Sequence, residues 1–216
     1  MTSANKSNGS TAPNIASGPQ AAGRTRITRA DIMPTAEYAR QRKELRARVT
    51  ALKRDRRVEV GPYCTFYFES WDTMRHQVHE MLHIEKGGED QIQGELDAYN
   101  ALVPNGAELV ATVMFEIDDP VRRANLLARL GGVQQTASLQ FGGETVTGIP
   151  EADQDRTNEA GKASSVQFIH FPFTKAQIEK FKRPGTQAIL GLAHPNYGHL
   201  AVLPESVRAA LAGDFA

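Results

Sequence analysis

The chain has 216 residues, and its 25 Lys and Arg side chains balance 25 Asp and Glu side chains. This length suits one domain of ordinary size, and the balanced charge gives no global attraction to nucleic acid or to an anionic membrane. The single cysteine, Cys64, excludes an intrachain disulfide and a cysteine-based zinc cluster. The sequence has neither an apolar run near the roughly 18 residues that span a bilayer nor the apolar core of a secretory signal. We therefore expect a soluble, cytoplasmic bacterial-type protein.

Residues 1–25 are rich in Ser, Ala, Asn, Gly and Pro and poor in large apolar side chains. Burial cannot offset the entropy of ordering such a segment, so it is predicted to be a disordered tail. Residues 26–216 are predicted to form one α+β domain.

A basic helix is predicted over residues 35–57, where Tyr38, Leu45, Val49 and Leu52 recur at near-helical spacing. Its other faces are basic through Arg40, Arg42, Lys43, Arg46, Arg48, Lys53, Arg54, Arg56 and Arg57. Such a surface is either a solvated face or a docking surface for phosphates or an acidic partner.

Helices and strands alternate irregularly along the rest of the chain. Strands are predicted at 63–69, 109–117, 165–171 and 187–192, with a hairpin of 133–141 and 144–149 across Gly142-Gly143. Helices are predicted from Ser70 or Asp72 to about Lys86, around 92–99, and at 121–130, 175–182 and 205–211. Residues 150–163 are polar and are predicted to form a loop. The hairpin forces antiparallel pairing, so we expect an α+β fold with a mixed, largely antiparallel sheet, flanking helices and a basic N-terminal helix.

Residues 79–83 read His-Glu-Met-Leu-His, which is the H-E-x-x-H pattern of zinc peptidases. On a helix, His79 and His83 can bind one Zn²⁺ while Glu80 takes a proton from a metal-bound water. A helical wheel places both histidines and His76 away from the apolar side, facing solvent, a cleft or a partner. The candidates for a third ligand are Glu95, His170, His194 and His199.

Two features weaken the peptidase interpretation. Glu85 occupies a position that is usually apolar in such helices, and no extended H-x-x-G-x-x-H continuation follows. The alternative is a solvated polar face.

Three further groups of residues carry side chains that could support chemistry. His194 and His199 flank Tyr197 in a predicted loop, which is either a functional loop or a polar loop around a packed tyrosine. His170 lies within a predicted strand and is expected to be structural. Cys64 shares a strand face with two phenylalanines, so we expect a core residue rather than a nucleophile.

Several collinear strings resemble one family. They are residues 63–69, 77–85, 95–100, 104–106, 165–168 and 194–199. Together with the basic helix, they resemble the bacterial domain-of-unknown-function family three-five-zero-one over nearly everything after the tail. The resemblance implies no established activity. It implies a redox or oxidative-stress setting, because such proteins are similar to neighbours of rubrerythrin-like di-iron proteins and of iron–sulfur oxidoreductases.

The resemblance also bears on the histidine motif. Glu80 and Glu85 match the family pattern Q-x-Q-E-M-L-x-x-E, whereas His79 and His83 depart from it. Carboxylates and histidines are also ligands of non-haem iron, so a metal role need not be a peptidase role.

Two functions from different classes follow. The first is an accessory or interaction protein in a redox pathway, with a redox protein as its partner and a zinc or iron site drawn from Glu80, Glu85, His79, His83, Glu95, His194 and His199. The second is a zinc-dependent hydrolase with His79 and His83 as ligands and Glu80 as its catalytic base.

Overall fold

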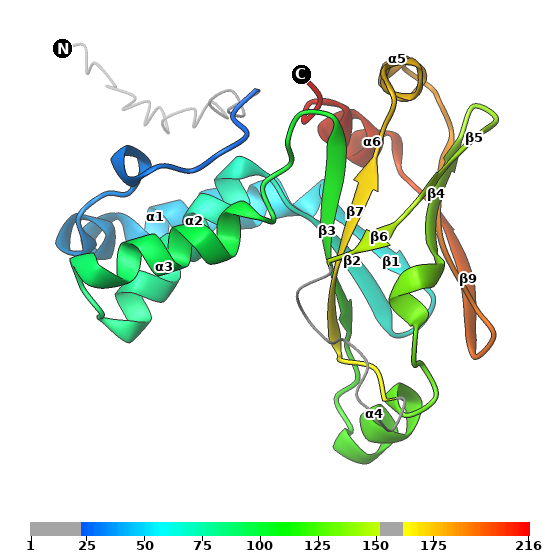
Figure 1. Cartoon of the computed structure of the whole chain (residues 1–216), viewed down its shortest axis with the longest axis horizontal. Helices are drawn as coiled ribbons and strands as arrows, with labels where there is room; N and C mark the ends of the chain where they lie inside the picture. Colours follow the sequence, from blue (N-terminus) through cyan, green and yellow to red (C-terminus); the bar gives the residue numbers. More distant parts are fainter. Residues whose placement is uncertain (1–22, 152–161) are drawn as a thin grey trace, which may run out of the picture.

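The computed structural model describes residues 23–151 and 162–216. Most of the predicted tail and most of the predicted loop at 150–163 lie outside the described residues. The described chain forms a layer of helices beside two sheets (Figure 1).

Three helices form the helical layer. They are α1 (Thr35–Arg54), α2 (Trp71–Glu85) and α3 (Glu89–Asn100). Helix α2 lies between the other two and contacts both. Apolar side chains of α2 and α3, such as Val78 and Leu96, form one hydrophobic cluster with the segment before α1. Helix α1 contributes little to this cluster, because Tyr38 is its only buried residue.

The strands pair in two antiparallel sheets. The first sheet has the order β1 (Arg57–Val60), β2 (Cys64–Phe68), β3 (Glu108–Phe115), β7 (Val166–Pro172) and β6 (Ile149–Pro150). The second has the order β5 (Glu144–Thr147), β4 (Ala137–Phe141), β8 (Ala188–His194) and β9 (Tyr197–Val202). The larger hydrophobic cluster draws on both sheets. The predicted α+β class is confirmed, with two sheets in place of one.

The remaining helices lie around the sheets. They are α4 (Pro120–Leu127), α5 (Lys175–Lys182) and α6 (Glu205–Ala212). Asp119 caps α4 by accepting from the backbone N–H of Arg122, and Thr174 caps α5 in the same way. These two starts agree with the sequence prediction.

Two strands, β1 and β9, lie where the sequence predicted no strand. The basic helix ends at Arg54 rather than near Arg57, and β1 follows it, with Val58 and Val60 buried against the other sheet residues. The predicted loop around Tyr197 is the β8–β9 hairpin, in which His194 pairs with Tyr197. Both strands are short and gain their register from a neighbour, so a local pattern gave little signal for them.

Among the described residues, no helix is both long and apolar enough to cross a membrane.

Candidate functional site

Helix α2 places the H-E-x-x-H residues against α1. Ser70 begins the helix as its N-cap by accepting from the backbone N–H of Thr73. The helix ends at a left-handed residue, Lys86, just before Gly87. These caps fix where each histidine lies along the α1–α2 contact.

His79 is buried, with 4% of its surface exposed. Its Nδ1 lies 2.8 Å from the carbonyl oxygen of Arg75, so Nδ1 carries the proton and donates it. Its Nε2 accepts from the backbone N–H of Met33 at 3.1 Å. Burial lowers the pKa of His79 to about 4. The ring is therefore neutral at pH 7, and both nitrogens are already used.

Tyr38 of α1 covers the histidine stripe. Its ring stacks on His79 with centroids 4.9 Å apart and meets the edge of His83 at 5.9 Å. Its hydroxyl lies 3.2 Å from Nδ1 of His76. The sequence predicted that His79 faces solvent, a cleft or a partner. His79 lines a cleft beside α1 but is buried beneath Tyr38, and the wheel of one helix cannot show that another helix covers its polar side.

Glu80 is held by α1 as well. Arg42 donates to both carboxylate oxygens of Glu80, at 2.8 Å each, and the Tyr38 hydroxyl donates to one of them. The Arg42 hydrogen bonds hold the pKa of Glu80 at about 2. A general base works best with a pKa near the working pH, so this carboxylate is poorly suited to that role. Tyr38, Arg42, His76, His79 and Glu80 form what we call the α1–α2 latch.

The other candidate ligands lie apart from the latch. The side-chain amide of Gln91 donates to Glu85 and to Glu95, which ties these two carboxylates to each other. His194 and His199 lie on the β8–β9 hairpin in the other layer. Within residues 23–151 and 162–216, no three His, Cys, Asp or Glu side chains are grouped so that they could hold a metal ion.

The strand histidine expected to be structural and two residues of the predicted loop all have local partners. His170 meets Glu108 at 3.0 Å across the β3–β7 pair, and this hydrogen bond raises the pKa of His170. His194 is buried with its Nε2 3.2 Å from the carbonyl oxygen of Gly131. Tyr197 donates to the carbonyl oxygen of Val60 at 3.0 Å, which joins the two sheets.

Zinc analysis tests the peptidase geometry directly. We expect protein purified without a histidine tag to carry the same zinc content as a His79→Ala, His83→Ala double variant, because His79 has no free nitrogen. Elemental analysis of the two proteins measures this. One zinc per chain that is lost in the double variant would restore the hydrolase interpretation.

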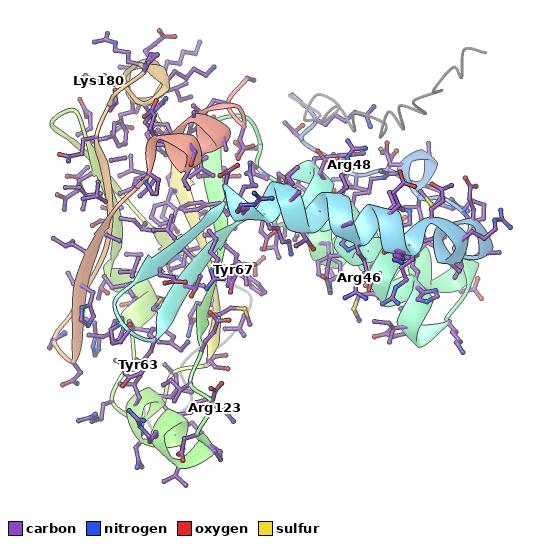
Figure 2. All side chains as sticks on the ribbon, turned by 180° about the vertical axis from the view of Figure 1, so that it is seen from behind. Arg46, Arg48, Tyr63, Tyr67, Arg123 and Lys180 are labelled. Carbon is purple, nitrogen blue, oxygen red and sulfur yellow. The ribbon has the colours of Figure 1, made fainter. Side chains whose placement is uncertain are left out.

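A basic groove runs along α1 beside the latch. It has a volume of about 470 Å³ and is lined by Arg42, Lys43, Arg46 and His83, together with Ala39, Ala47 and Thr50. Its lining carries three cations and no carboxylate. Arg42 is already paired with Glu80, so Lys43 and Arg46 supply the free charge. Figure 2 shows Arg46 on one edge of α1 and Arg48 on the opposite edge.

Sequence reasoning missed the partners of Glu80. Tyr38 was assigned to the apolar stripe, and its hydroxyl and the neighbouring Arg42 were not linked to α2. Their spacing on α1 was the available signal, since residues four apart share a helix face. That signal shows which side chains act together but not what they contact.

Comparison with known proteins finds one matching family model and a similar solved structure. A family model described as a protein of unknown function (DUF3501) matches residues 26–215. A solved structure, a novel protein of unknown function from Burkholderia pseudomallei K96243, is 39% identical and superimposes with a TM-score of 0.82. The match covers 88% of this chain and 99% of that chain. No curated protein matches the chain.

Proposed function

The chain belongs to the DUF3501 family, and we propose from the geometry that it is an accessory protein that docks an acidic partner protein on α1. The observation that carries this proposal is the exposed, unneutralised positive charge of that helix.

The charge of α1 is arranged for contact rather than for internal pairing. Arg40, Lys43, Arg46 and Arg54 are exposed. None of the four side chains forms a hydrogen bond or an ion pair with another residue of the described chain. Glu44 is the one exposed carboxylate among them, so the face stays net positive. A positive patch of this kind attracts an acidic partner and speeds its encounter.

A protein partner suits this face better than a nucleic acid. The chain has zero formal net charge, and α1 carries no aromatic side chain besides the buried Tyr38. Base stacking therefore has no platform on the exposed face of this helix. In the groove, Thr50 and His83 lie beside Lys43 and Arg46. Together these side chains can bind the carboxylates of an acidic partner.

The sequence resemblance implies a redox setting, and we extend the proposal to an acidic redox protein as the partner. Cys64 is buried in the core, and this burial raises the pKa of its thiol. A thiol held in this way is unreactive. Any electron transfer would then belong to the partner and its own cofactor, which is the division of labour expected for an accessory protein.

Charge reversal tests the docking face. We expect a fluorescein-labelled acidic peptide to bind the wild-type protein with an affinity that falls as salt rises. A Lys43→Glu, Arg46→Glu double variant should bind about tenfold more weakly or worse, because two attractions become repulsions. Fluorescence anisotropy measures both. A rubrerythrin-like protein in place of the peptide tests the redox partner.

A matched control carries the same change of charge elsewhere. Lys175 and Lys182 are exposed on α5, so a Lys175→Glu, Lys182→Glu variant should bind as the wild type does. Equal loss in both variants would mean nonspecific attraction and would contradict the proposal. Tighter binding of double-stranded DNA than of the peptide would assign α1 to nucleic acid instead.

A further inference from the structure

A second cleft lies on the other edge of α1, between α1, α2 and the segment before α1. Its volume is about 360 Å³, which falls within the range of small-molecule sites. Arg48 lines it from α1, Arg75 and Trp71 line it from α2, and Arg24 lines it from the preceding segment. The basic groove lies on the opposite edge, where Figure 2 shows Arg46.

The cations of this cleft are only partly neutralised. Arg24 pairs with Asp31 at 3.1 Å, and Asp31 also accepts from Thr28. Asp72 is the second carboxylate in the lining. Arg75 uses its Nε to donate to the backbone oxygen of Asp31 at 2.8 Å, which leaves the two terminal nitrogens of its guanidinium for another acceptor.

Of the three arginines in this cleft, Arg48 has the fewest side-chain partners. Its side chain lines the cleft and forms no hydrogen bond or ion pair within residues 23–151 and 162–216. Arg24, Arg48 and Arg75 line the same cleft, and burial together with the charges of Arg24 and Arg48 lowers the pKa of Arg75. Three arginines facing two carboxylates leave a net positive cleft. Arginine forks bind carboxylate or phosphate oxygens in pairs.

The remaining wall of the cleft is apolar. Met33, Leu45 and Val49 line it. Leu45 and Val49 belong to the stripe that packs α1, yet neither is fully buried. Apolar walls beside a few placed cations are the usual make-up of a site for an organic ligand.

We infer that this cleft binds a small organic anion, with its carboxylate or phosphate group on Arg48 and Arg75 and its apolar part against Leu45 and Val49. This inference goes beyond the proposed docking of a protein, and it rests on a different edge of α1.

Trp71 makes the inference directly measurable. It is the only tryptophan of the chain. Arg24 lies 4.6 Å and Arg75 lies 5.3 Å from the centre of its ring. An anion that draws Arg75 away from the indole changes the surroundings of the single fluorophore, so tryptophan emission reports binding in this cleft.

The experiment titrates the full chain with phenyl phosphate, benzoate and inorganic phosphate at constant ionic strength. We expect a saturable change in emission with phenyl phosphate or benzoate, and weaker binding of inorganic phosphate, which lacks the apolar part. The tighter of the two aromatic ligands identifies the headgroup. The absence of saturation with both of them, or equal affinity for inorganic phosphate, would overturn the inference.

Arg48→Gln is the decisive variant, because Arg48 has no partner within the described chain whose loss would unfold the protein. It should weaken binding about tenfold, as expected for loss of a charge-assisted hydrogen bond. Arg46→Gln removes the same charge from the opposite edge of α1 and should leave binding unchanged, whereas the acidic peptide should respond to Arg46 rather than to Arg48. Equal anion binding by wild type and Arg48→Gln would overturn the inference without touching the proposed docking face.

Discussion

Replacing Arg56 by alanine is expected to lower the free energy of unfolding by about 3–5 kcal/mol, the largest effect of any single change considered. The side chain of Arg56 is 1% exposed and that of Asp214, its ion-pair partner, is 9% exposed. Arg56 also donates to the backbone oxygens of Phe68 and Glu69, at 3.0 and 2.8 Å. The variant would leave a buried carboxylate and two carbonyl oxygens without their donor, and urea unfolding followed by circular dichroism measures the loss.

The neighbouring arginine provides the control. Arg57 is exposed and pairs with exposed Glu59, so Arg57→Ala should change the free energy of unfolding by no more than about 0.5 kcal/mol. An Arg56→Ala, Asp214→Ala double variant should lose less than the sum of the two single changes, since it leaves no unpaired buried charge. An Arg56→Ala variant as stable as Arg57→Ala would show that the pair does not anchor this region.

The position of Arg56 explains why this matters for the proposed function. It lies two residues after the end of α1 and ties that end of the helix to β2 and to the C-terminal residues. The α1–α2 latch holds the other half of the helix through Tyr38 and Arg42. Since α1 buries only Tyr38, these polar anchors fix the helix that carries both the basic groove and the anion cleft.

Local signals in the sequence predicted most of the helices. Helix α2 was found because Ser70 is a good N-cap and Gly87-Gly88 a good stop. Helix α5 was predicted near residues 175–182, which are its observed bounds, and the structure shows that Thr174 and Gln177 form a capping box at its start. Caps and periodicity lie within a few residues of each other, so one sequence is sufficient to recognise them.

Long-range contacts account for what the sequence did not show. Arg56 was assigned to a basic helix face, because its buried partner Asp214 lies near the other end of the chain. The histidine stripe resembled a metal site because nothing in α2 itself reveals that Tyr38 stacks on His79. In both cases a polar residue pattern marks a buried structural contact, and only the packing of distant elements distinguishes that contact from an exposed site.

Acid is expected to weaken the fold through His79 well before the carboxylates titrate. The pKa of His79 is about 4 in the folded protein, below the ordinary value of 6.5. Between these two values the unfolded chain binds a proton that the folded chain does not, so the free energy of unfolding falls as the pH falls. The shift corresponds to a loss of about 3 kcal/mol from pH 7 to pH 4. Urea unfolding at a series of pH values measures it.

Several other groups titrate near this window, and a variant separates them. His76 also has a lowered pKa and adds to the loss, whereas His170 has a raised pKa and gains stability as the pH falls. Glu80, with a pKa of about 2, loses its contribution only below about pH 4.5. His79→Gln keeps an acceptor for the Met33 N–H but cannot be protonated.

The difference between the two pH profiles isolates His79. We expect the His79→Gln profile to be flatter than that of the wild type by about 3 kcal/mol over this range. Identical profiles would show that the pKa of His79 is not lowered in the folded protein, which would contradict its burial beneath Tyr38. Because protonation would place a second N–H of the ring against the Met33 N–H, we expect it to loosen the segment before α1, which forms one wall of the anion cleft. Since the folded ring takes up its proton only near pH 4, phenyl phosphate binding should weaken around pH 4 in the wild type more than in His79→Gln.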